Sequence, residues 1–160
     1  MPTFEAQLEE LYRSRYRGFV EVVASVAGGY DRAHDAVQEG FARALASENG
    51  FRGGSLEAWV MRIALNAAID TRRRDRDRPF TGEVADPRPV RADRDPDLEH
   101  ALLALPPRRR LMVFLRYFAD LSYADIAAVT GTSEGTVAAT LNQAHAALRD
   151  ALSEPQEIGP

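Results

Sequence analysis

The chain has 160 residues with 20 basic and 24 acidic side chains, a formal net charge of −4, and therefore room for one ordinary domain or two small ones. Hydrophobic residues make up 45% of it, which is enough for packed cores and argues against global disorder. The absence of cysteine excludes disulfide frameworks, thiolate metal sites and cysteine nucleophiles. No apolar run approaches the roughly 18 residues that cross a bilayer, and the N-terminus lacks a secretory signal pattern. We therefore expect a cytoplasmic protein without membrane insertion.

The first half of the chain shows apolar residues at the spacing of amphipathic helices. A first helix is predicted from Phe4 to Val26, closed by a Gly-Gly pair. Asp31 is expected to cap a second helix that stops at an Asn-Gly pair, and Ser55 is expected to cap a third. No stretch alternates apolar and polar residues for the length of a strand, so the sequence predicts an all-α fold.

A proline-rich stretch separates two predicted domains. Residues 79–97 carry four prolines and alternating charges with hardly any large apolar side chain, so they cannot bury enough surface to offset the cost of ordering. This composition predicts a flexible Pro/Asp-rich linker. The predicted boundaries are 1–78 for the first domain, 79–95 for the linker, 96–154 for the second domain and 155–160 for a tail.

The second half contains the pattern of a helix-turn-helix. Ser122, followed three residues later by Asp125, predicts the capped start of one helix, and a Thr-Gly-Thr triplet predicts its end. Ser133 is expected to cap a longer last helix with a narrow apolar stripe. Two helices joined by a tight turn that contains glycine are typical of DNA-binding domains.

The most concentrated charge lies at the end of the third predicted helix. Arg72, Arg73 and Arg74 are followed there by two more arginines. On one interpretation these cations only stabilise the negative end of the helix dipole. On the other they bind phosphates, because the helix upstream carries an aromatic and several hydrogen-bonding groups suited to unstacked bases, namely Trp59, Arg62, Asn66 and Asp70. Trp59 also lies on an apolar stripe, so a place in the core stays open for it.

The second predicted helix carries a polar face that includes His34, Asp35, Gln38 and Glu39. The reciprocal ligands that a helical metal site needs on another helix are missing, so we expect no metal. The spacing leaves open whether this face is solvent surface or a docking face. No phosphate-binding loop with lysine and no G-x-S-x-G motif occurs, so we expect neither an enzyme nor a cofactor.

Three segments resemble, in order, the motifs of bacterial sigma factors of the extracytoplasmic-function (ECF) group. DRAHDAVQEGFARAL is similar to their core-polymerase-binding segment, with its D-x-V-Q-E-x-F-x-R-A pattern. FRGGSLEAWVMRIALNAAIDTRRRDR is similar to their promoter-melting segment, and LPPRRRLMVFLRYFADLSYADIAAVTGTSEGTV to their C-terminal domain. The resemblance runs from about Leu8 to Leu152. It implies a sigma2-like helical bundle and a sigma4-like helix-turn-helix domain.

The resemblance also implies functional roles for individual residues. The residues that it places at the β′ subunit of RNA polymerase are Asp35, Gln38, Glu39 and Arg43. Those that it places at the −10 promoter element are Phe51, Arg52, Trp59, Asn66, Asp70, Arg73 and Arg74. The chain would then bind core RNA polymerase through its β′ and β subunits, recognise promoter DNA and support transcription initiation without catalysis of its own. An anti-sigma factor is a further candidate partner.

The predicted recognition helix departs from the family pattern. Members of the family usually show G-T-V-K-S-R-L-x-R-A-R, whereas this chain has GTVAATLNQAHAALR, and no arginine occurs between Ser122 and Leu148. We therefore expect weak DNA binding at the −35 element. The candidate residues there are Ser133, Thr136, Ala139, Asn142 and Gln143. The two amide side chains among them can pair with adenine edges.

Two other hypotheses stay open at this point. The missing basic residues favour a sigma-like regulatory or interaction protein whose C-terminal domain no longer reads −35 DNA. An independent helix-turn-helix repressor is favoured less, because neither a dimer interface of its own nor a basic reading helix is evident in the sequence.

Overall fold

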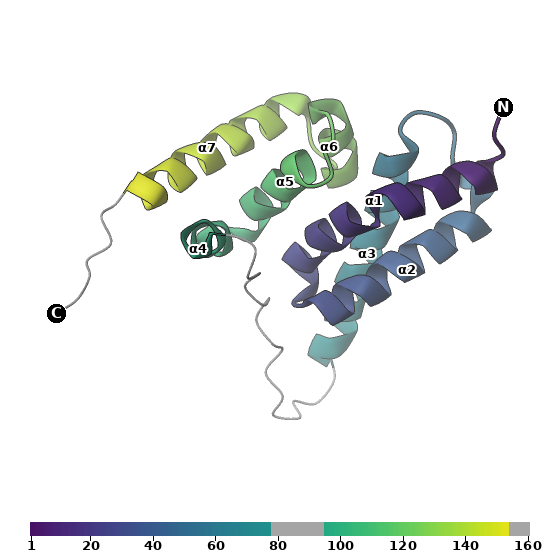
Figure 1. Cartoon of the computed structure of the whole chain (residues 1–160), viewed down its shortest axis with the longest axis horizontal. Coiled ribbons are helices and arrows are strands. Elements are labelled where there is room, and N and C mark those ends of the chain that lie inside the picture. The colour runs from purple at the N-terminus through teal and green to yellow at the C-terminus, as the bar shows by residue number, and fades with distance from the viewer. Residues whose placement is uncertain (78–94, 154–160) are drawn as a thin grey trace.

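A computed structural model describes residues 1–77 and 95–153, and all regular structure within these ranges is helical. The first half consists of α1 (Phe4–Ala27), α2 (Tyr30–Ala46), a short 3-10 turn η1 (Glu48–Gly50) and α3 (Leu56–Asp77). The second half consists of α4 (Pro96–Ala104), α5 (Pro107–Tyr117), α6 (Tyr123–Thr130) and α7 (Glu134–Ser153). The predicted all-α fold is confirmed, and Figure 1 shows the two groups of helices side by side. The predicted tail, and the predicted linker up to residue 94, lie outside the described residues.

Local capping explains where the helices of the first half begin and end. The Ser55 hydroxyl accepts a hydrogen bond from the backbone N–H of Ala58 at 3.1 Å, as predicted for the start of α3. The prediction for α2 was wrong by two residues, because α2 follows Gly29 directly and Asp31 lies inside its first turn. Gly28 and Gly29 adopt φ angles of 85° and 155°, which let the chain reverse without a longer loop.

The second half shows the predicted helix-turn-helix. Ser122 caps α6 by accepting a hydrogen bond from the N–H of Asp125 at 3.1 Å, and Ser133 caps α7 by accepting one from Thr136 at 3.1 Å. Gly131 ends α6 in the left-handed conformation with φ of 68°. Prolines occupy the first positions of α4 and α5, where the missing N–H has no partner within the helix anyway.

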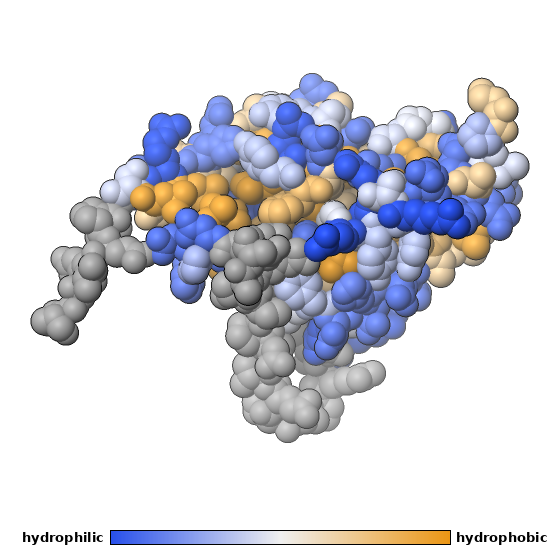
Figure 2. All heavy atoms as spheres, viewed as in Figure 1, coloured by the Kyte–Doolittle hydropathy of each residue, from blue (hydrophilic) through white to orange (hydrophobic). Residues whose placement is uncertain are grey.

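Each half has buried apolar side chains of its own. In the first half Phe19, Val22, Val37, Val60 and Met61 are fully buried between α1, α2 and α3. In the second half the fully buried side chains come from α5, α6 and α7, namely Met112, Phe114, Leu115, Ile126, Val137 and Leu141. Figure 2 shows an apolar strip along the α4 and α7 side of the second half, where Leu98 and Leu152 are exposed.

The two halves also pack on each other. Helix α1 contacts α5, and α3 contacts α6, so the buried apolar side chains form one continuous cluster. Arg15 on α1 donates from Nη2 to the carbonyl oxygen of Ala119 at 2.7 Å and from Nε to Glu57 Oε1 at 3.1 Å. Burial raises the pKa of the Glu57 carboxyl above its ordinary value, and the Arg15 guanidinium offsets part of that rise. No local pattern in the sequence predicts this contact.

None of the helices in residues 1–77 and 95–153 has the combination of length and apolar character that a bilayer crossing requires.

A glycine at the α2–α3 contact is predicted to be essential for close packing. A Cβ at Gly40 would lie 2.8 Å from Cα and Cβ of Ala64, too close for either helix to stay in place. Overpacking of this kind costs about 1–3 kcal/mol, against a gain in helix propensity of about 0.5–1 kcal/mol. We expect Gly40→Ala to lower the free energy of unfolding by about 1–2 kcal/mol in urea denaturation followed by circular dichroism.

The matched control is Gly135→Ala in the first turn of α7, where the nearest heavy atom, Ser133 Oγ, would be 3.9 Å from the new Cβ. That variant should be as stable as the wild type or slightly more stable. Equal effects of the two substitutions would contradict the packing argument.

The position of Glu57 predicts a pH dependence of stability. Because its pKa is raised in the folded chain, the protonated form favours folding, and that contribution is lost as the pH rises through the raised pKa. Glu57→Gln removes this titration. From about pH 4 to about pH 7 the wild type should therefore lose stability relative to Glu57→Gln, measured as the difference between their free energies of unfolding. A difference that stays constant with pH would contradict the expectation.

Candidate functional site

The polar face of α2 is exposed along its length. Asp35, Gln38 and Glu39 are all exposed, and they lie within little more than one helical turn. The opposite face of α2 is buried against α1 and α3 through Ala36, Val37 and other small or apolar side chains. The fold thus presents three of the four predicted polymerase-binding residues together on one surface.

Arg43 connects this surface to α3. Its Nε donates to Glu39 Oε1 at 2.9 Å, and its Nη1 lies 4.0 Å from Asp70 Oδ2. The side chains of Arg43 and Asp70 are 40% and 48% exposed, so water screens both pairs and each adds little to stability. The alignment of α2 with α3 comes instead from their buried contact, where Gly40 packs against Ala64.

The loop before α3 is held by an aromatic cluster. The ring centroids of Phe51 and Trp59 lie 5.4 Å apart, and Phe4 on α1 lies 6.0 Å from Phe51 and 6.2 Å from Trp59. All three side chains are half-buried. The interpretation that Trp59 packs in the core fits this geometry, and the cluster leaves the neighbouring Arg52 exposed at the tip of the loop.

An exposed stripe on α3 brings cations, an amide and an apolar side chain together. Arg62, Asn66, Ile69 and Arg73 are all exposed and follow one another at spacings of four, three and four residues, which places them on one face. We call these four residues the α3 stripe. The sequence analysis assigned Asn66 and Arg73 to the −10 element and noted Arg62 on the same helix, but it did not name Ile69. The spacing of three residues from Asn66 is the signal that places Ile69 on this face.

The arginines at the end of α3 have different roles. Arg72 donates from Nη1 to the carbonyl oxygen of Val26 at 2.8 Å, which satisfies a carbonyl in the last turn of α1. Arg73 and Arg74 are exposed. The structure therefore assigns Arg72 to the contact between two helices and leaves Arg73 and Arg74 as candidates for phosphate binding.

The outer face of α7 is almost uncharged. The exposed residues along its first three turns include Thr136, Ala139, Asn142 and Gln143. Ser133 and Thr136 also hydrogen-bond to each other through their hydroxyls at 3.0 Å. His145, for which no partner was evident in the sequence, accepts or donates a hydrogen bond at 2.7 Å to Tyr117 on α5. All five predicted −35 residues are thus on the surface of the helix-turn-helix.

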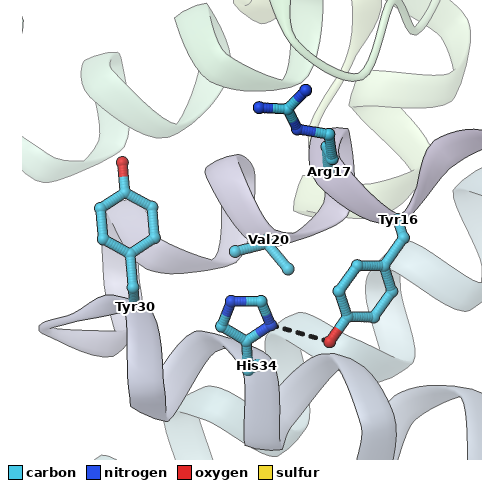
Figure 3. A pocket seen from close by; sticks show the side chains of 5 residues that line it. All are labelled: Tyr16, Arg17, Val20, Tyr30 and His34. Carbon is cyan, nitrogen blue, oxygen red and sulfur yellow. Dashed lines mark hydrogen bonds between the residues drawn. The ribbon is translucent and has the colours of Figure 1, made fainter. Parts of the chain in front are cut away.

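A small cavity lies between α1 and α2 beside the polar face of α2 (Figure 3). Its volume is about 230 Å³, and it is lined by Tyr16, Arg17, Val20, Tyr30 and His34. Tyr16 Oη and His34 Nδ1 are 2.8 Å apart, and burial raises the pKa of the Tyr16 phenol above its ordinary value. The cavity is smaller than typical ligand pockets of roughly 300–1,000 Å³, so it does not favour a cofactor.

Within the residues that the structure describes, no three His, Cys, Asp or Glu side chains group closely enough to hold a metal ion.

Comparison with known families accounts for both halves of the chain. Residues 11–78 match the family described as Sigma-70 region 2, and residues 96–148 match the one described as Sigma-70, region 4. Over 146 residues the chain is 34% identical to the ECF RNA polymerase sigma factor EcfG of Rhodopseudomonas palustris, covering 85% of this chain and 81% of the relative. The chain belongs to the ECF group of sigma factors. The predicted sigma2-like and sigma4-like architecture is confirmed.

Other relatives agree with this assignment. The chain is 33% identical over 158 residues to the ECF RNA polymerase sigma factor SigE of Mycolicibacterium smegmatis, a match that covers 91% of this chain but only 58% of that relative. It is 28% identical over 164 residues to the RNA polymerase sigma factor YlaC of Bacillus subtilis, with 94% of both chains covered. None of these relatives favours the hypothesis of a regulatory protein that has lost DNA reading.

Solved structures show the same fold. The sigma factor RpoE in its complex with the anti-sigma factor NepR from Bartonella quintana matches with a TM-score of 0.72 and 24% identity, over 94% of this chain and 99% of that one. CnrH in complex with the cytosolic domain of CnrY matches with a TM-score of 0.67 and 21% identity, over 92% of this chain and 88% of that one. At these identities the likeness concerns the fold.

Proposed function

We propose that the chain binds core RNA polymerase through the exposed face of α2 and directs it to promoters. The observation that carries the proposal is the joint placement of this face and the α3 stripe on one helical unit, held together by the buried contact of α2 with α3. A protein that docks on the polymerase through α2 then holds α3 in a fixed position near the DNA. Asp35, Gln38 and Glu39 are the polymerase contacts in this proposal.

At the −10 element, α3 and the loop before it would contact the DNA. The α3 stripe supplies phosphate-binding cations at both ends and an amide between them, which suits a separated strand. Arg52 at the loop tip and Arg74 extend the positive charge. Phe51 and Trp59 support the loop from within through their contacts with Phe4, and Asp70 acts through Arg43.

At the −35 element, α7 would enter the major groove with little electrostatic attraction to the DNA phosphates, because its outer face carries few charges. Asn142 and Gln143 are exposed and are the side chains able to pair with base edges, each good bidentate pair giving about 1–3 kcal/mol of discrimination. Ser133 and Thr136 lie at the N-terminal end of α7, where backbone N–H groups favour a phosphate. We infer that α7 adds selectivity, whereas most of the affinity comes from the polymerase and from α3.

The same proposal covers the remaining properties of the protein. It acts in the cytoplasm with the polymerase, and it performs no catalysis, since the chemistry of RNA synthesis belongs to the core enzyme. An anti-sigma factor is a candidate partner because a structure of the same fold is that of the sigma factor RpoE in complex with the anti-sigma factor NepR.

The proposal is tested by co-elution with purified core RNA polymerase on a sizing column, which requires no knowledge of the promoter. We expect the wild type to bind stoichiometrically and the triple variant Asp35→Ala, Gln38→Ala, Glu39→Ala to lose binding at moderate salt. The matched control is Glu5→Ala, Gln7→Ala, Glu10→Ala, which removes the same chemical groups from the exposed side of α1. Absence of wild-type binding, or equal loss in both variants, would refute the proposed role of α2.

The arginines of α3 give a second prediction. In the complex of polymerase, this chain and promoter DNA, Arg73→Ala and Arg74→Ala should each make the negative slope of log K against log salt concentration shallower by about 0.7–0.9, since each arginine neutralises one phosphate. Binding to the core enzyme itself should not change.

Arg72→Ala is the matched control for this experiment. It should lower the free energy of unfolding because it removes the hydrogen bond to Val26, and it should leave the salt slope unchanged. A slope change for Arg72→Ala as large as for its two neighbours would contradict the division of roles.

A further inference from the structure

The cavity between α1 and α2 is lined by groups that together favour an anion. Figure 3 shows Val20 between the His34 ring and the Arg17 guanidinium. The phenol rings of Tyr16 and Tyr30 lie on either side. The lining residues include the permanent positive charge of Arg17 and no aspartate or glutamate, and protonation of His34 would only add to that charge.

The charge of Arg17 has no partner in the part of the chain that the structure describes. Its side chain is exposed and makes no hydrogen bond or ion pair with the described residues. Arg13, one turn earlier on α1, pairs instead with Glu9 at 2.6 Å. The nearby buried Glu21 is contacted by Tyr30, whose hydroxyl lies 3.4 Å and 3.3 Å from its two carboxylate oxygens. Arg17 is therefore available to an anion from outside.

The cavity has the size of one side chain. Its volume of about 230 Å³ does not suit a typical cofactor, yet it is several times the roughly 30 Å³ that a water molecule occupies. A side chain of a partner protein can therefore replace the water in the cavity and bring its end group to Arg17. Guanidinium and carboxylate groups form two parallel hydrogen bonds, so an aspartate or a glutamate is the matching side chain.

The cavity lies beside the surface that the proposed function assigns to the polymerase. His34 directly precedes Asp35, and Gln38 lies about one turn further along α2. Burial raises the pKa of the Tyr16 phenol, hydrogen bonding with Gln38 counteracts this rise, and the charge of Asp35 adds to it, so both residues lie close to Tyr16. A polymerase segment bound to the α2 face therefore passes next to the cavity.

A row of aromatic rings extends from the cavity along α1. The ring centroids of Tyr12 and Tyr16 are 4.9 Å apart, and those of Tyr16 and His34 are 5.6 Å apart. Tyr12 is 39% exposed although its ring is large and mostly apolar. Exposed tyrosines are enriched among the residues that contribute most to protein–protein binding. The surroundings of the cavity thus fit a protein partner.

We propose that this cavity receives an aspartate or glutamate side chain of core RNA polymerase, which pairs with Arg17. The inference rests on the proposed function, which brings the polymerase to the α2 face. That face is acidic through Asp35 and Glu39 and favours cations on the polymerase, so the cavity adds a contact of opposite sign at its edge. Because contacts of both signs are satisfied together in only one orientation, Arg17 is a specificity-determining residue of the complex.

Affinity measurements with purified core RNA polymerase separate the cavity from general electrostatics. Arg17→Gln removes the cation, whereas Val20→Phe fills the cavity without a change in charge. Arg13→Gln is the matched control, because it removes the same charge from the same helix one turn away from the cavity. Circular dichroism shows whether each variant keeps its helix content. Since Arg17 is exposed, Arg17→Gln should fold even if Val20→Phe does not.

We expect Arg17→Gln and Val20→Phe each to raise the Kd for the core enzyme about tenfold, and Arg13→Gln to change it less than about twofold. Equal effects of the two arginine substitutions would overturn the inference, because they would indicate long-range electrostatics alone. A folded Val20→Phe variant with the affinity of the wild type would overturn it as well. Absence of wild-type binding would contradict the proposed function and this inference together.

Cross-linking tests the chemistry of the group that meets Arg17. The chain contains no lysine, so Arg17→Lys introduces its only side-chain amine. A carbodiimide joins this amine to a carboxylate that lies against it, and mass spectrometry identifies the linked residue in the complex with the core enzyme. We expect a link to an aspartate or glutamate of the polymerase for Arg17→Lys and none to the polymerase for Arg13→Lys. A complex that forms without a link at position 17 would overturn the assignment of a carboxylate.

Discussion

The burial of the second half of α1 is the constraint on which the rest of the structure depends. From Phe19 to Ala27 nearly every residue of this helix is buried, including the polar Glu21 and Ser25. A helix that is buried on all sides must be surrounded by other helices. Helices α2 and α3 cover it from one half of the molecule and α5 from the other. The same helix therefore lies in the core of the sigma2-like unit and also forms the surface on which α5 of the sigma4-like unit packs. A change in the packing of the sigma2-like core would consequently change the orientation of the sigma4-like unit.

The two proposed DNA-binding surfaces, on α3 and on α7, differ in charge. Cations accumulate on α3 and at its end, whereas the outer face of α7 is built from small and amide side chains. Electrostatic attraction to phosphates is nearly independent of sequence, while hydrogen bonds to base edges are not. In the proposed function, affinity and selectivity are consequently carried by different helices. The polymerase holds both in place through α2.

Much of the fold followed from local rules. Ser55, Ser122 and Ser133 cap the helices that they were predicted to cap, because a helix cap depends only on a few neighbouring residues. The start of α2 was predicted two residues too late. Gly28 and Gly29 form a tight turn directly before Tyr30, so the helix begins without an aspartate cap. The bonds of Arg15 to Ala119 and of Arg110 to Ser25 could not be predicted, since they join residues more than 80 positions apart whose sequence neighbourhoods carry no sign of each other. Motif similarity predicted that Asp35, Gln38 and Glu39 bind the polymerase, and the fold places them on one exposed face of α2. It assigned only Asn66 and Arg73 of the α3 stripe, because the motif names single positions, whereas the stripe follows from the helical spacing of all four residues.

The neutral surface of α7 also bears on how such a protein is distributed in a cell. A bacterial chromosome offers about a million or more competing sites to any DNA-binding protein. A basic recognition helix binds each of these sites weakly and non-specifically through the phosphates. A helix whose outward side chains are alanine, threonine, asparagine and glutamine has little attraction for random DNA. Helix α7 would then add little to non-specific binding. The number of copies held on random DNA would depend on the exposed arginines of α3 rather than on the recognition helix.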